Sequence, residues 1–407
     1  MHSDKINAVV TRNMFTSKEI ADAYRQAGGQ NNYTRTAKLL TALGRGPVYR
    51  QLARNWVLGL DDTEIPDQAT LAQQSIKARN AQASATAARR ELKALHEHIE
   101  INDITMGAID EAAQHLAQRP PIEYYEKPES DGTPCTVELL LSDLQMGKLG
   151  AQYNTEIARA RLFEYGRAAT KQIQQKIALG YDVERLVLAM LGDIIESDKK
   201  HKNSARATDS GTADQMRDAM EAIHELVIEP LARFGVPMDV ICITGNHDHD
   251  DHGLMMWKPG REQLSWPLYH AMAGFAKYAG LHHVNYIIPE GAFATTEFYG
   301  QVALYEHGVG VAVNEMAMKA QKIKRAEQLQ KHITYFRMGD KHSVCGFNNH
   351  QYVVNGAFFG STGAGIEYSE ISGYSSIPAQ WIGFHVPRKD NRFTFYDSFV
   401  IQFDHIV

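Results

Sequence analysis

Three short apolar runs, each ending in acidic or amide residues at a turn, constrain the fold of this chain more than any other feature. They are TVELLLSD (136–143), RLVLAMLGD (185–193) and MDVICITGNH (238–247). Short runs rich in β-branched residues and leucine are typical of buried strands, and helix-like stretches lie between these runs. The alternation predicts an α/β fold in which the polar ends of successive strands converge on one edge of a sheet, where ligands bind.

Acidic, amide and histidine residues follow these runs and two later ones, QVALYEHG and ITYFRMGDKH. In chain order they are Asp143, Gln145, Asp193, Glu196, Asn246, His247, His307, Asp340 and His342. The three cysteines are widely spaced and odd in number, which argues against a disulfide framework and against a thiolate zinc cluster. Any metal would therefore be held by oxygen and nitrogen ligands.

The order and spacing of these residues resemble the calcineurin-like metallophosphoesterases, whose motifs read D-x-H, G-D-x-x-D/E, G-N-H-D/E, a histidine before glycine, and G-H-x-H. The resemblance runs from about residue 136 to residue 342 or somewhat beyond. It implies a four-layer sandwich of two mixed β-sheets flanked by helices, spanning residues 134–407. The closing segments QYVVNGAFFGS, AQWIGFHVP and FTFYDSFVIQF are compatible with the second sheet of such a sandwich.

The resemblance also implies two divalent metal ions that share Asp193 as a bridging ligand. The other ligands of the first ion would be Asp143, His342 and, through its amide oxygen, Gln145. The other ligands of the second ion would be Asn246, His307 and Asp340.

Two positions depart from the family pattern, because Gln145 and Asp340 stand where the family has histidines. An amide oxygen and a carboxylate are harder ligands than imidazole, so we expect manganese, or magnesium, rather than zinc. Gln145 is a neutral, weak donor, whereas Asp340 adds negative charge. We therefore expect a loosely held ion beside Asp143 and a tightly held ion beside Asp340.

The resemblance assigns catalytic roles to His247, which donates a proton to the leaving group, and to Glu196, which orients that histidine. A carboxylate partner favours the imidazolium form that an acid requires. Two cations favour a bridging hydroxide near neutral pH and neutralise the phosphoryl oxygens during attack. The expected reaction is hydrolysis of a phosphodiester.

Other polar residues near these motifs are expected to be solvent-facing, at the rim of the site, or structural. In the HDHDDH segment they are His249, Asp250, Asp251 and His252. KKHK (199–202) and Arg206 are expected to form a solvated charged face. His282, His283, His332 and His350 are expected to be surface or structural histidines.

Charge is unevenly distributed along the chain. Residues 1–60 hold nine Lys and Arg against three Asp and Glu, a net charge of +6, whereas the whole chain has −6. Such asymmetry is a better guide to partners than the total charge.

The same basic segment has the pattern of a small helical domain. Thr16 to Glu19 reads as a capping box that starts one helix, and a second helix begins near Tyr33. The stretch TAKLLTALGRGPVYRQLARN resembles a helix-turn-helix module, whose third helix, here about 47–55, lies in the major groove of DNA. By that resemblance the residues facing DNA would be Arg45, Tyr49, Arg50 and Arg54. A helical bundle used for protein contacts is the alternative interpretation.

Residues 61–133 are predicted to be a linker whose helical part ends at Pro120 and Pro121. A helix stripe follows coiled-coil spacing through Ala81, Ala85, Ala88, Leu92, Leu95 and Ile99. The stripe could pair two chains or hold the N-terminal module away from the rest, and we expect at least a dimer through residues 80–115.

The expected function is that of a DNA nuclease, because a DNA-binding domain raises the local concentration of phosphodiester bonds at the site. The layout resembles DNA-processing nucleases of this superfamily, including exonuclease subunits of repair complexes and proteins encoded by phages. A phosphodiesterase or phosphatase acting on nucleotides or other small phosphoesters is one alternative. A non-catalytic DNA-binding or assembly protein with a decayed metal site is another, although a scaffold has no evident use for a leaving-group acid such as His247.

The sequence predicts a cytoplasmic protein that does not enter a membrane. No apolar run reaches the roughly 20 residues needed to span a bilayer. The first residues, MHSDKINAVVTRNMF, lack the continuous apolar segment of a secretory signal.

Overall fold

The computed structural model describes the chain except for residues 1–14, 30, 46, 61–67, 127–130, 151, 199–206, 250–258, 361–367, 374–376 and 390–392. The chain divides into two compact units, Met1–Ile99 and Glu100–Val407. In the part of the chain that is described, no helix is both long enough and apolar enough to cross a membrane.

The N-terminal unit contains a bundle of three short helices, α2 (Ser17–Gln26), α3 (Tyr33–Ala42) and α4 (Arg50–Val57). The expected capping box is present, because the Glu19 N–H donates to Thr16 Oγ1 at 3.2 Å and the Thr16 N–H donates to the Glu19 carboxylate at 2.8 Å. Its core is formed by apolar side chains including Phe15, Ile20, Leu40, Trp56 and Val57.

The third helix begins at Arg50, three residues later than the sequence predicted. Residues 47–49 precede it without helical structure, and the Val48 N–H donates to Thr41 Oγ1 at 2.9 Å. Val48 thereby joins the core of the bundle. This packing, together with the extended backbone of Tyr49, delays the start of the helix.

The predicted linker helix is α5 (Gln68–Ala117), a single helix of 50 residues. Ala81, Ala85 and Ala88 of the predicted stripe are exposed, while the side chains of Leu92, Leu95 and Ile99 lie outside the described ones. Near its C-terminal end, α5 packs against the core of the second unit through Ile109, Ala112 and Leu116. Just beyond the helix, Arg119 forms ion pairs with Glu225 at 2.8 Å and Glu229 at 2.6 Å.

The first sheet of the second unit has six strands in the order β11-β10-β1-β2-β3-β4. Their bounds are β1 (Thr133–Leu141), β2 (Tyr181–Leu191), β3 (Met238–Ile243), β4 (Val284–Ile287), β10 (Ala379–His385) and β11 (Phe395–Gln402). The strands β1 to β4 are parallel, whereas β10 and β11 run antiparallel to their neighbours.

The last two strands correct the sequence interpretation, which assigned the closing segments to the second sheet. β10 pairs with β1, with His385 opposite Thr136 and Ile382 opposite Leu139, so β10 and β11 belong to the first sheet. Every residue of β10 is buried, and a strand buried on both faces requires a central position. Only the segment around Tyr352 joins the second sheet.

The second sheet has five strands in the order β5-β6-β7-β9-β8. Their bounds are β5 (Phe293–Phe298), β6 (Gln301–Glu306), β7 (Tyr335–Met338), β8 (Cys345–Phe347) and β9 (Tyr352–Val354). The strands β6, β7 and β9 are parallel, and the two edge strands are antiparallel to their neighbours. Both sheets are therefore mixed, as predicted.

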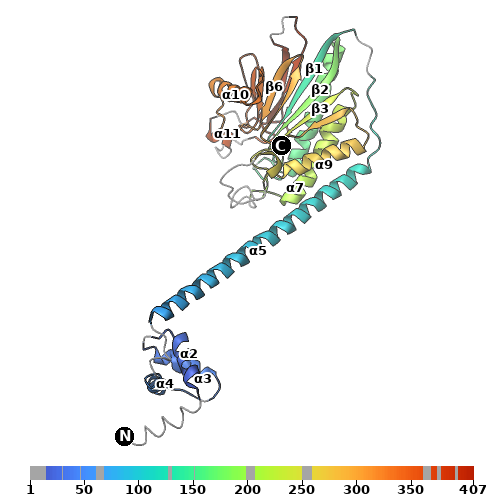
Figure 1. The fold of residues 1–407 in the computed structure, drawn as a ribbon. Helices are drawn as coiled ribbons and strands as arrows, with labels where there is room; N and C mark the ends of the chain where they lie inside the picture. The colour runs from blue at the N-terminus through green and yellow to red at the C-terminus, as the bar shows by residue number, and fades with distance from the viewer. Residues whose placement is uncertain are drawn as a thin grey trace, which may run out of the picture. The chain divides into compact units, whose positions relative to one another are not determined.

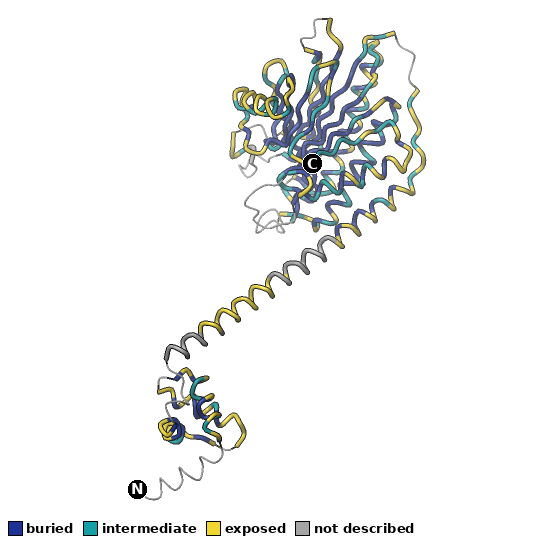
Figure 2. The backbone as a smooth tube through the Cα atoms, in the orientation of Figure 1, coloured by how far each residue is buried: buried dark blue, intermediate teal, exposed yellow. Residues whose placement is uncertain are grey.

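The two sheets pack face to face, and helices cover their outer faces (Figure 1). Leu140, Val187 and Ile241 of the first sheet share one buried cluster with Phe298 and Tyr305 of the second. The first sheet is covered by α6 (Thr155–Ala178), α7 (Thr212–Ile223) and α9 (Ser265–Tyr278), and the second by α10 (Glu315–Leu329). This is the predicted four-layer sandwich, with its buried residues concentrated in the strands (Figure 2).

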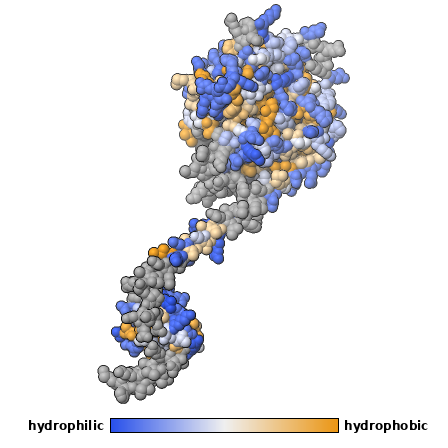
Figure 3. Space-filling model, viewed as in Figure 1, coloured by the Kyte–Doolittle hydropathy of each residue, from blue (hydrophilic) through white to orange (hydrophobic). Residues whose placement is uncertain are grey.

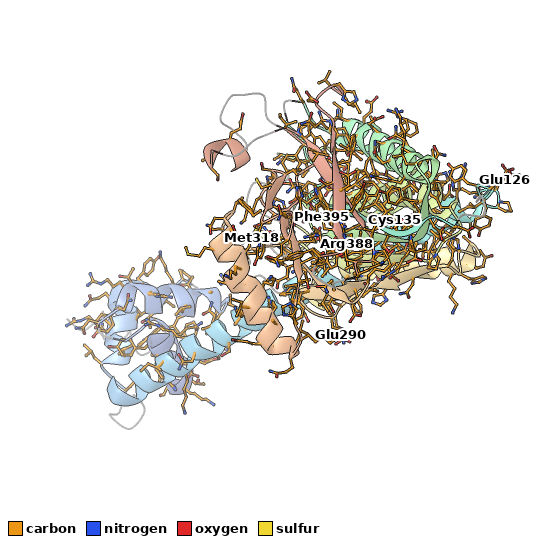
Figure 4. The ribbon with its side chains drawn as sticks, turned by 90° about the horizontal axis from the view of Figure 1, so that it is seen from above. Glu126, Cys135, Glu290, Met318, Arg388 and Phe395 are labelled. Atoms are coloured by element: carbon orange, nitrogen blue, oxygen red, sulfur yellow. The ribbon has the colours of Figure 1, made fainter. Side chains whose placement is uncertain are left out.

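The outer helix α10 contributes little to the buried core. Met318 is its buried residue and is labelled in Figure 4. The visible face of the helix is hydrophilic (Figure 3).

A π-helical turn, η2 (His224–Ile228), connects α7 to the short helix α8 (Glu229–Ala232). It lies so close to α6 that a Cβ atom added at Gly166 would meet the Leu226 carbonyl oxygen at 1.8 Å. Two further short elements are η3 (Gly260–Glu262) and α11 (Tyr368–Ile371).

A buried ionic network joins the two sheets. The Glu138 carboxylate on β1 accepts hydrogen bonds from Arg337 Nε at 2.9 Å and from the Tyr305 hydroxyl at 2.7 Å. His385 Nε2 lies 3.0 Å from the other carboxylate oxygen. These four side chains are fully buried, so the network ties β1 to β7. Those two strands lead into the loops of Asp143 and Asp340.

Candidate metal centre

Five strands of the two sheets end at one place. Asp143 and Asp193 each come two residues after their strands, β1 and β2, and Asn246 follows β3. From the second sheet, His307 directly follows β6 and Asp340 comes two residues after β7. The predicted convergence of polar residues at the carboxyl ends of the strands is therefore found, with both sheets contributing.

The centre of this place is a buried group formed by Asp143, Asp193 and His307, whose potential ligand atoms all lie within 4.8 Å of one another. His307 Nε2 is 3.3 Å from Asp193 Oδ1. His342 Nε2 is 3.4 Å from Asp143 Oδ1. Three carboxylate and imidazole side chains at such spacing can hold a divalent cation.

The backbone is left-handed at five of the predicted ligands. The φ angles are 52° at Asp143, 42° at Gln145, 52° at Asp193, 65° at Asp340 and 56° at His342. Each such non-glycine conformation costs on the order of 1–3 kcal/mol and persists where the surroundings over-determine it. Backbone hydrogen bonds do so here, since the Gln145 N–H donates to the Asp193 carbonyl at 2.8 Å.

A second network of amides holds the Asp143 loop. Gln380 on β10 accepts from the Ser142 N–H at 3.0 Å and donates to the Ser142 carbonyl at 3.1 Å. Asn355 donates to Ser142 Oγ at 3.0 Å. All three side chains are buried, so the residue next to Asp143 is held from two other strand segments.

Among the predicted metal ligands, two buried oxygens have no hydrogen-bond donor in the part of the chain that is described, Asp143 Oδ1 and Gln145 Oε1. Gln145 is fully buried, and its side-chain Nε2 donates a long hydrogen bond to Asp193 Oδ2, with 3.5 Å between the two atoms. A buried polar atom without a partner costs free energy unless an ion or water satisfies it. The two oxygens therefore fit a cation, and Gln145 fits the role of an oxygen ligand.

His307 is oriented for ligation by its other ring nitrogen. Its Nδ1–H donates to the Leu191 carbonyl at 2.6 Å, which leaves Nε2 facing Asp193 and, at 2.9 Å, Asn246 Oδ1. Burial alone would lower the pKa of His307, but the negative charges of Asp193, Asp340 and Asp143 outweigh it and raise the pKa to about 10. The surroundings thus favour a positive charge at the position of Nε2, where a metal ion would bind.

Asp340 lies at the more exposed side of the cluster. Its Oδ1 is 3.7 Å from His307 Nε2, and its N–H donates to Asp143 Oδ2 at 3.1 Å. Its other oxygen accepts a hydrogen bond from Lys341 Nζ at 2.5 Å. Lys341 offsets part of the charge that Asp340 brings to the site, a contact that the sequence interpretation did not include.

His247 and Glu196 form the predicted pair beside this cluster. His247 Nδ1 lies 3.1 Å from Glu196 Oε2, an ion-pair distance without the alignment of a good hydrogen bond. His247 Nε2 lies 3.9 Å from Asp193 Oδ2. The His247 N–H donates to Asp193 Oδ1 at 2.8 Å. The imidazole is therefore beside the proposed bridging carboxylate.

Asp248 organises the loops and was not assigned a role from the sequence. Its buried carboxylate accepts hydrogen bonds from Ser265 Oγ and from the N–H groups of Asp193, Ile194, Ile195 and Gly245, at 2.7–3.3 Å. Burial and the nearby charge of Asp193 raise the pKa of Asp248. The acidic residue at the end of the G-N-H-D stretch could have indicated this role from the sequence. Asp248 holds the Asp193 and His247 loops together.

The structure also corrects the placement of His249, which the sequence interpretation assigned to solvent or the rim. His249 is 6% exposed, and its carbonyl accepts from Ser197 Oγ at 2.6 Å. Asp250, Asp251 and His252, the KKHK stretch and Arg206 lie outside the described residues. His282 and His332 are exposed, and His283 and His350 are partly buried with partners, as expected for surface or structural histidines.

The proposed DNA-facing residues of the N-terminal unit differ in their surroundings. Tyr49 is 71% exposed, and Arg50 and Arg54 are exposed on α4. Arg45 instead forms an ion pair with Glu19 at 2.9 Å, which links the turn after α3 to the start of α2. The sequence interpretation did not name Gln51 and Asn55, which are exposed on the same short helix. Gln51 and Asn55 directly follow Arg50 and Arg54 in the sequence, and this position could have indicated that they share the exposed face of the helix.

Neither a known family model nor a curated protein matches the sequence. A comparison with solved structures found similarity to a conserved protein of Streptococcus pneumoniae described as a predicted phosphoesterase, at 10% identity and TM-score 0.26, over 66% of this chain and 98% of that one. Another is vacuolar protein sorting 29 of Cryptosporidium parvum, at 9% identity and TM-score 0.30, over 66% and 98%. A third is a putative 5'-nucleotidase of Staphylococcus aureus, at 11% identity and TM-score 0.26, over 66% and 54%.

Proposed function

We propose that this protein is a metal-dependent phosphoester hydrolase and that its substrate is DNA. The observation that carries the proposal is the position of the His247 and Glu196 pair, which lies against the buried Asp143, Asp193 and His307 group. A metal-binding group alone has many uses. A histidine that is held by a carboxylate beside such a group can protonate the alkoxide that leaves during phosphoester hydrolysis.

Two divalent ions held by the predicted ligands would supply the charge that activates water and neutralises the phosphoryl oxygens. The ligands would be Asp143, Gln145, Asp193 and His342 for one ion and Asp193, Asn246, His307 and Asp340 for the other. We propose manganese, with magnesium as the second choice, because oxygen donors predominate in this set.

The protein's own residues perform the remaining work. His247 donates the proton from Nε2 to the leaving oxygen, and Glu196 holds the ring through Nδ1 and stabilises the imidazolium form. Asp248 keeps the loop of His247 against the loop of Asp193 through its five hydrogen bonds. Positioning of this kind lowers the barrier because the groups need no reorganisation at the moment of reaction.

The exposed face of α4 supports DNA as the substrate. Arg50 and Arg54 can contact phosphates, while Gln51 and Asn55 carry amides that suit the edges of bases in the major groove. The segment 1–60 is basic in an otherwise acidic chain. A basic module tethered to a hydrolase would keep phosphodiester bonds near the site.

The decisive assay incubates the purified chain with linear, nicked and single-stranded DNA in the presence of manganese. We expect cleavage that the double variant Asp193→Ala/His247→Ala lacks, and equal cleavage by both proteins would refute the nuclease assignment. Turnover of cyclic nucleotides in preference to DNA oligomers would instead support the phosphodiesterase alternative. A chain that binds DNA and turns over neither substrate would be a binding or assembly protein.

A further inference from the structure

A pocket of about 510 Å³ lies in the outer helical layer of the second unit. Its walls come from α6, η2, α8 with the residue that follows it, and the segment after α5. The predicted metal ligands lie elsewhere, in the loops at the carboxyl ends of the strands. Pockets for small molecules typically measure roughly 300–1,000 Å³, so this one is large enough for such a ligand.

Close contacts fix the walls of the pocket. α6 and η2 approach so closely that a Cβ atom at Gly166 would meet the Leu226 carbonyl oxygen at 1.8 Å. The segment after α5 is held as well, because the Tyr125 N–H donates to the Arg233 carbonyl at 2.7 Å. The Tyr125 ring also packs against Phe234, with centroids 5.0 Å apart. The pocket is therefore largely preformed, as is usual for small-molecule sites.

Positive charge predominates in the lining of the pocket. Among the described residues, the charged ones that line it are Arg167, Lys171, Arg233 and Glu225. The Glu225 carboxylate already pairs with Arg119 at 2.8 Å. Arg167 pairs with Glu164 at 2.6 Å. These two pairs balance their own charges, which leaves two cations of the lining for a ligand.

Those two cations are Arg233 and Lys171, and neither forms an ion pair within the described part of the chain. The Arg233 side chain is only partly exposed, and its buried Nε has no hydrogen-bond acceptor among the described residues. Thr170, beside Lys171 on α6, has a buried hydroxyl that likewise has no partner there. Donors that are kept from water without an acceptor cost free energy. The pocket therefore favours a ligand with negatively charged oxygens.

The pocket also offers apolar contact area. Its apolar and aromatic lining residues are Tyr125, Phe163, Leu226 and Pro230. Phe163 is 57% exposed, although it lies on a helix that packs against the core. A mostly apolar lining with a few polar groups is the usual composition of a site for an organic ligand. An inorganic anion would use the two cations and leave the aromatic wall in water.

We propose that this pocket binds a small organic anion, in which a phosphate, phosphonate or carboxylate group is attached to an aromatic group. The anionic oxygens contact the guanidinium of Arg233 and the ammonium of Lys171, a charge-assisted interaction. The aromatic group packs against Phe163 and Tyr125. The inference does not depend on the proposed hydrolase activity, because no proposed metal ligand or catalytic residue lines the pocket.

The test uses the full chain, with and without manganese, and measures binding by titration calorimetry. The probes are phenylphosphonate, benzoate, inorganic phosphate and the neutral benzyl alcohol. Phenylphosphonate holds its phosphorus through a carbon bond, so a phosphoesterase does not hydrolyse it. Without manganese, the probes have no metal ion to bind at the metal centre. The thermal midpoint is measured with and without each probe, because a ligand of the folded state raises it.

We expect one site for an aromatic anion in the metal-free chain, with the same affinity after manganese is added. Arg233→Met should weaken phenylphosphonate binding by about ten- to a hundredfold, the range for hydrogen bonds to charged groups. Lys171→Met should have a smaller effect in the same direction, since this lysine is exposed. Phe163→Ala should weaken phenylphosphonate binding and leave the binding of inorganic phosphate unchanged.

The matched control is Lys324→Met, which removes an exposed lysine from α10 on the other sheet. It should bind the probes as the unsubstituted protein does. An equal loss in Lys324→Met would show that only the overall charge matters, and the inference would be wrong. Lys171 is exposed, so its variant decides the question if Arg233→Met lowers the thermal midpoint of the free protein.

The affinities for the probes also decide the class of ligand. Tighter binding of phenylphosphonate than of benzoate supports a phosphate-type ligand, and the reverse order supports a carboxylate. Equal binding of benzyl alcohol would overturn the inference, as would the absence of binding at millimolar phenylphosphonate. A chain that binds phenylphosphonate without hydrolysing any phosphoester would contradict the proposed function and leave this inference supported.

Discussion

His247 Nδ1 lies 3.1 Å from Glu196 Oε2, and the ring's Nε2 lies 3.9 Å from Asp193 Oδ2. Glu196 is 6% exposed, and burial alone would raise its pKa. The charges of His247 and Lys148 outweigh burial and keep the pKa of Glu196 below its ordinary value. The partner of His247 is therefore a carboxylate at neutral pH, as a stabilised imidazolium needs.

The first prediction concerns the pH dependence of this pair. A leaving-group acid must be protonated, so activity falls as pH rises through the pKa of that acid. Replacing Glu196 by Gln removes the anion that favours imidazolium, and this lowers the pKa of the acid. The alkaline limb of kcat/KM should therefore move to lower pH in Glu196→Gln, with a lower maximum rate.

The control for this prediction is Glu156→Gln, an exposed glutamate in the first turn of α6. Its pH profile should match that of the unsubstituted protein. An unmoved alkaline limb in Glu196→Gln, with normal folding, would show that Glu196 does not act through His247.

The sequence predicted which loops meet because each parallel strand ends at the same edge of its sheet. Asp143, Asp193 and Asn246 could be placed by this rule alone, and the structure brings their loops together. The rule could not assign β10, because a strand that is buried on both faces has no alternation to show which sheet it joins. The pairing of β10 with β1 joins residues that lie far apart in the chain, such as Thr136 and His385.

Side-chain contacts that depend on the folded backbone could not be predicted from the sequence either. Asp248 lies in the motif itself, yet its role depends on donors from the Asp193 loop and from Ser265 at the start of α9, as well as from Gly245 in its own loop. Arg45 was expected to face DNA and pairs with Glu19, because the turn after α3 returns to the start of α2. Lys341 follows a proposed ligand, but its contact with that ligand depends on a left-handed loop conformation.

The second prediction concerns the buried network between the sheets. Replacing Arg337 by Met leaves the Glu138 carboxylate buried without its main cation, which should cost about 3–5 kcal/mol of unfolding free energy. The double variant Glu138→Gln/Arg337→Met should lose less, because no charge is then stranded. Urea unfolding at neutral pH measures both.

The pH dependence of stability tests the same network. Burial would raise the pKa of Glu138, but Arg337 and His385 lower it from its ordinary 4.5 to about 2. A carboxyl with a lowered pKa contributes its full stabilisation above the ordinary value and loses it as pH falls toward 2. The advantage of the unsubstituted protein over the double variant should therefore shrink below about pH 4.5. A difference that is independent of pH would contradict this role of Glu138.

The third prediction concerns the N-terminal unit. Replacing both Arg50 and Arg54 by Ala should weaken DNA binding and flatten its salt dependence, because fewer counterions are released. Arg45→Ala should have a smaller effect, since that arginine already pairs with Glu19. Titrations of labelled duplex DNA at low and moderate salt measure these effects.

Removal of residues 1–60 provides the companion experiment. It should weaken DNA binding while hydrolysis of a small chromogenic phosphodiester continues. Unchanged DNA affinity after the truncation would make this unit a protein-contact domain and remove the main support for a nuclease.

The fourth prediction concerns the exposed part of α5. Ala81, Ala85 and Ala88 lie at coiled-coil spacing and are exposed within the chain, and we propose that they pair with a second copy. Light scattering should then give at least a dimer, and the double variant Ala85→Glu/Ala88→Glu should shift it toward monomer. A monomeric unsubstituted chain would rule this pairing out.

The last prediction concerns the two residues that depart from the family pattern. The uncharged Gln145 offers an oxygen that has no hydrogen-bond donor among the described residues, so the ion beside Asp143 should bind more weakly than the ion beside His307 and Asp340. Titration calorimetry with manganese should show two unequal sites. Gln145→His should tighten the weak site, and Asp340→Ala should abolish the tight one.

Lys341 provides a sharper test of the same idea, because its ammonium contacts Asp340 and competes with a cation for that carboxylate. Lys341→Met should strengthen the tight site, since the full charge of Asp340 then faces the ion. The matched Lys322→Met, which changes a lysine outside the site, should leave both affinities unchanged. Equal affinity at the two positions, or no binding at millimolar manganese, would show that Gln145 and Asp340 do not divide the site in this way. Weaker binding in Lys341→Met would show that the lysine holds Asp340 in place instead of neutralising it.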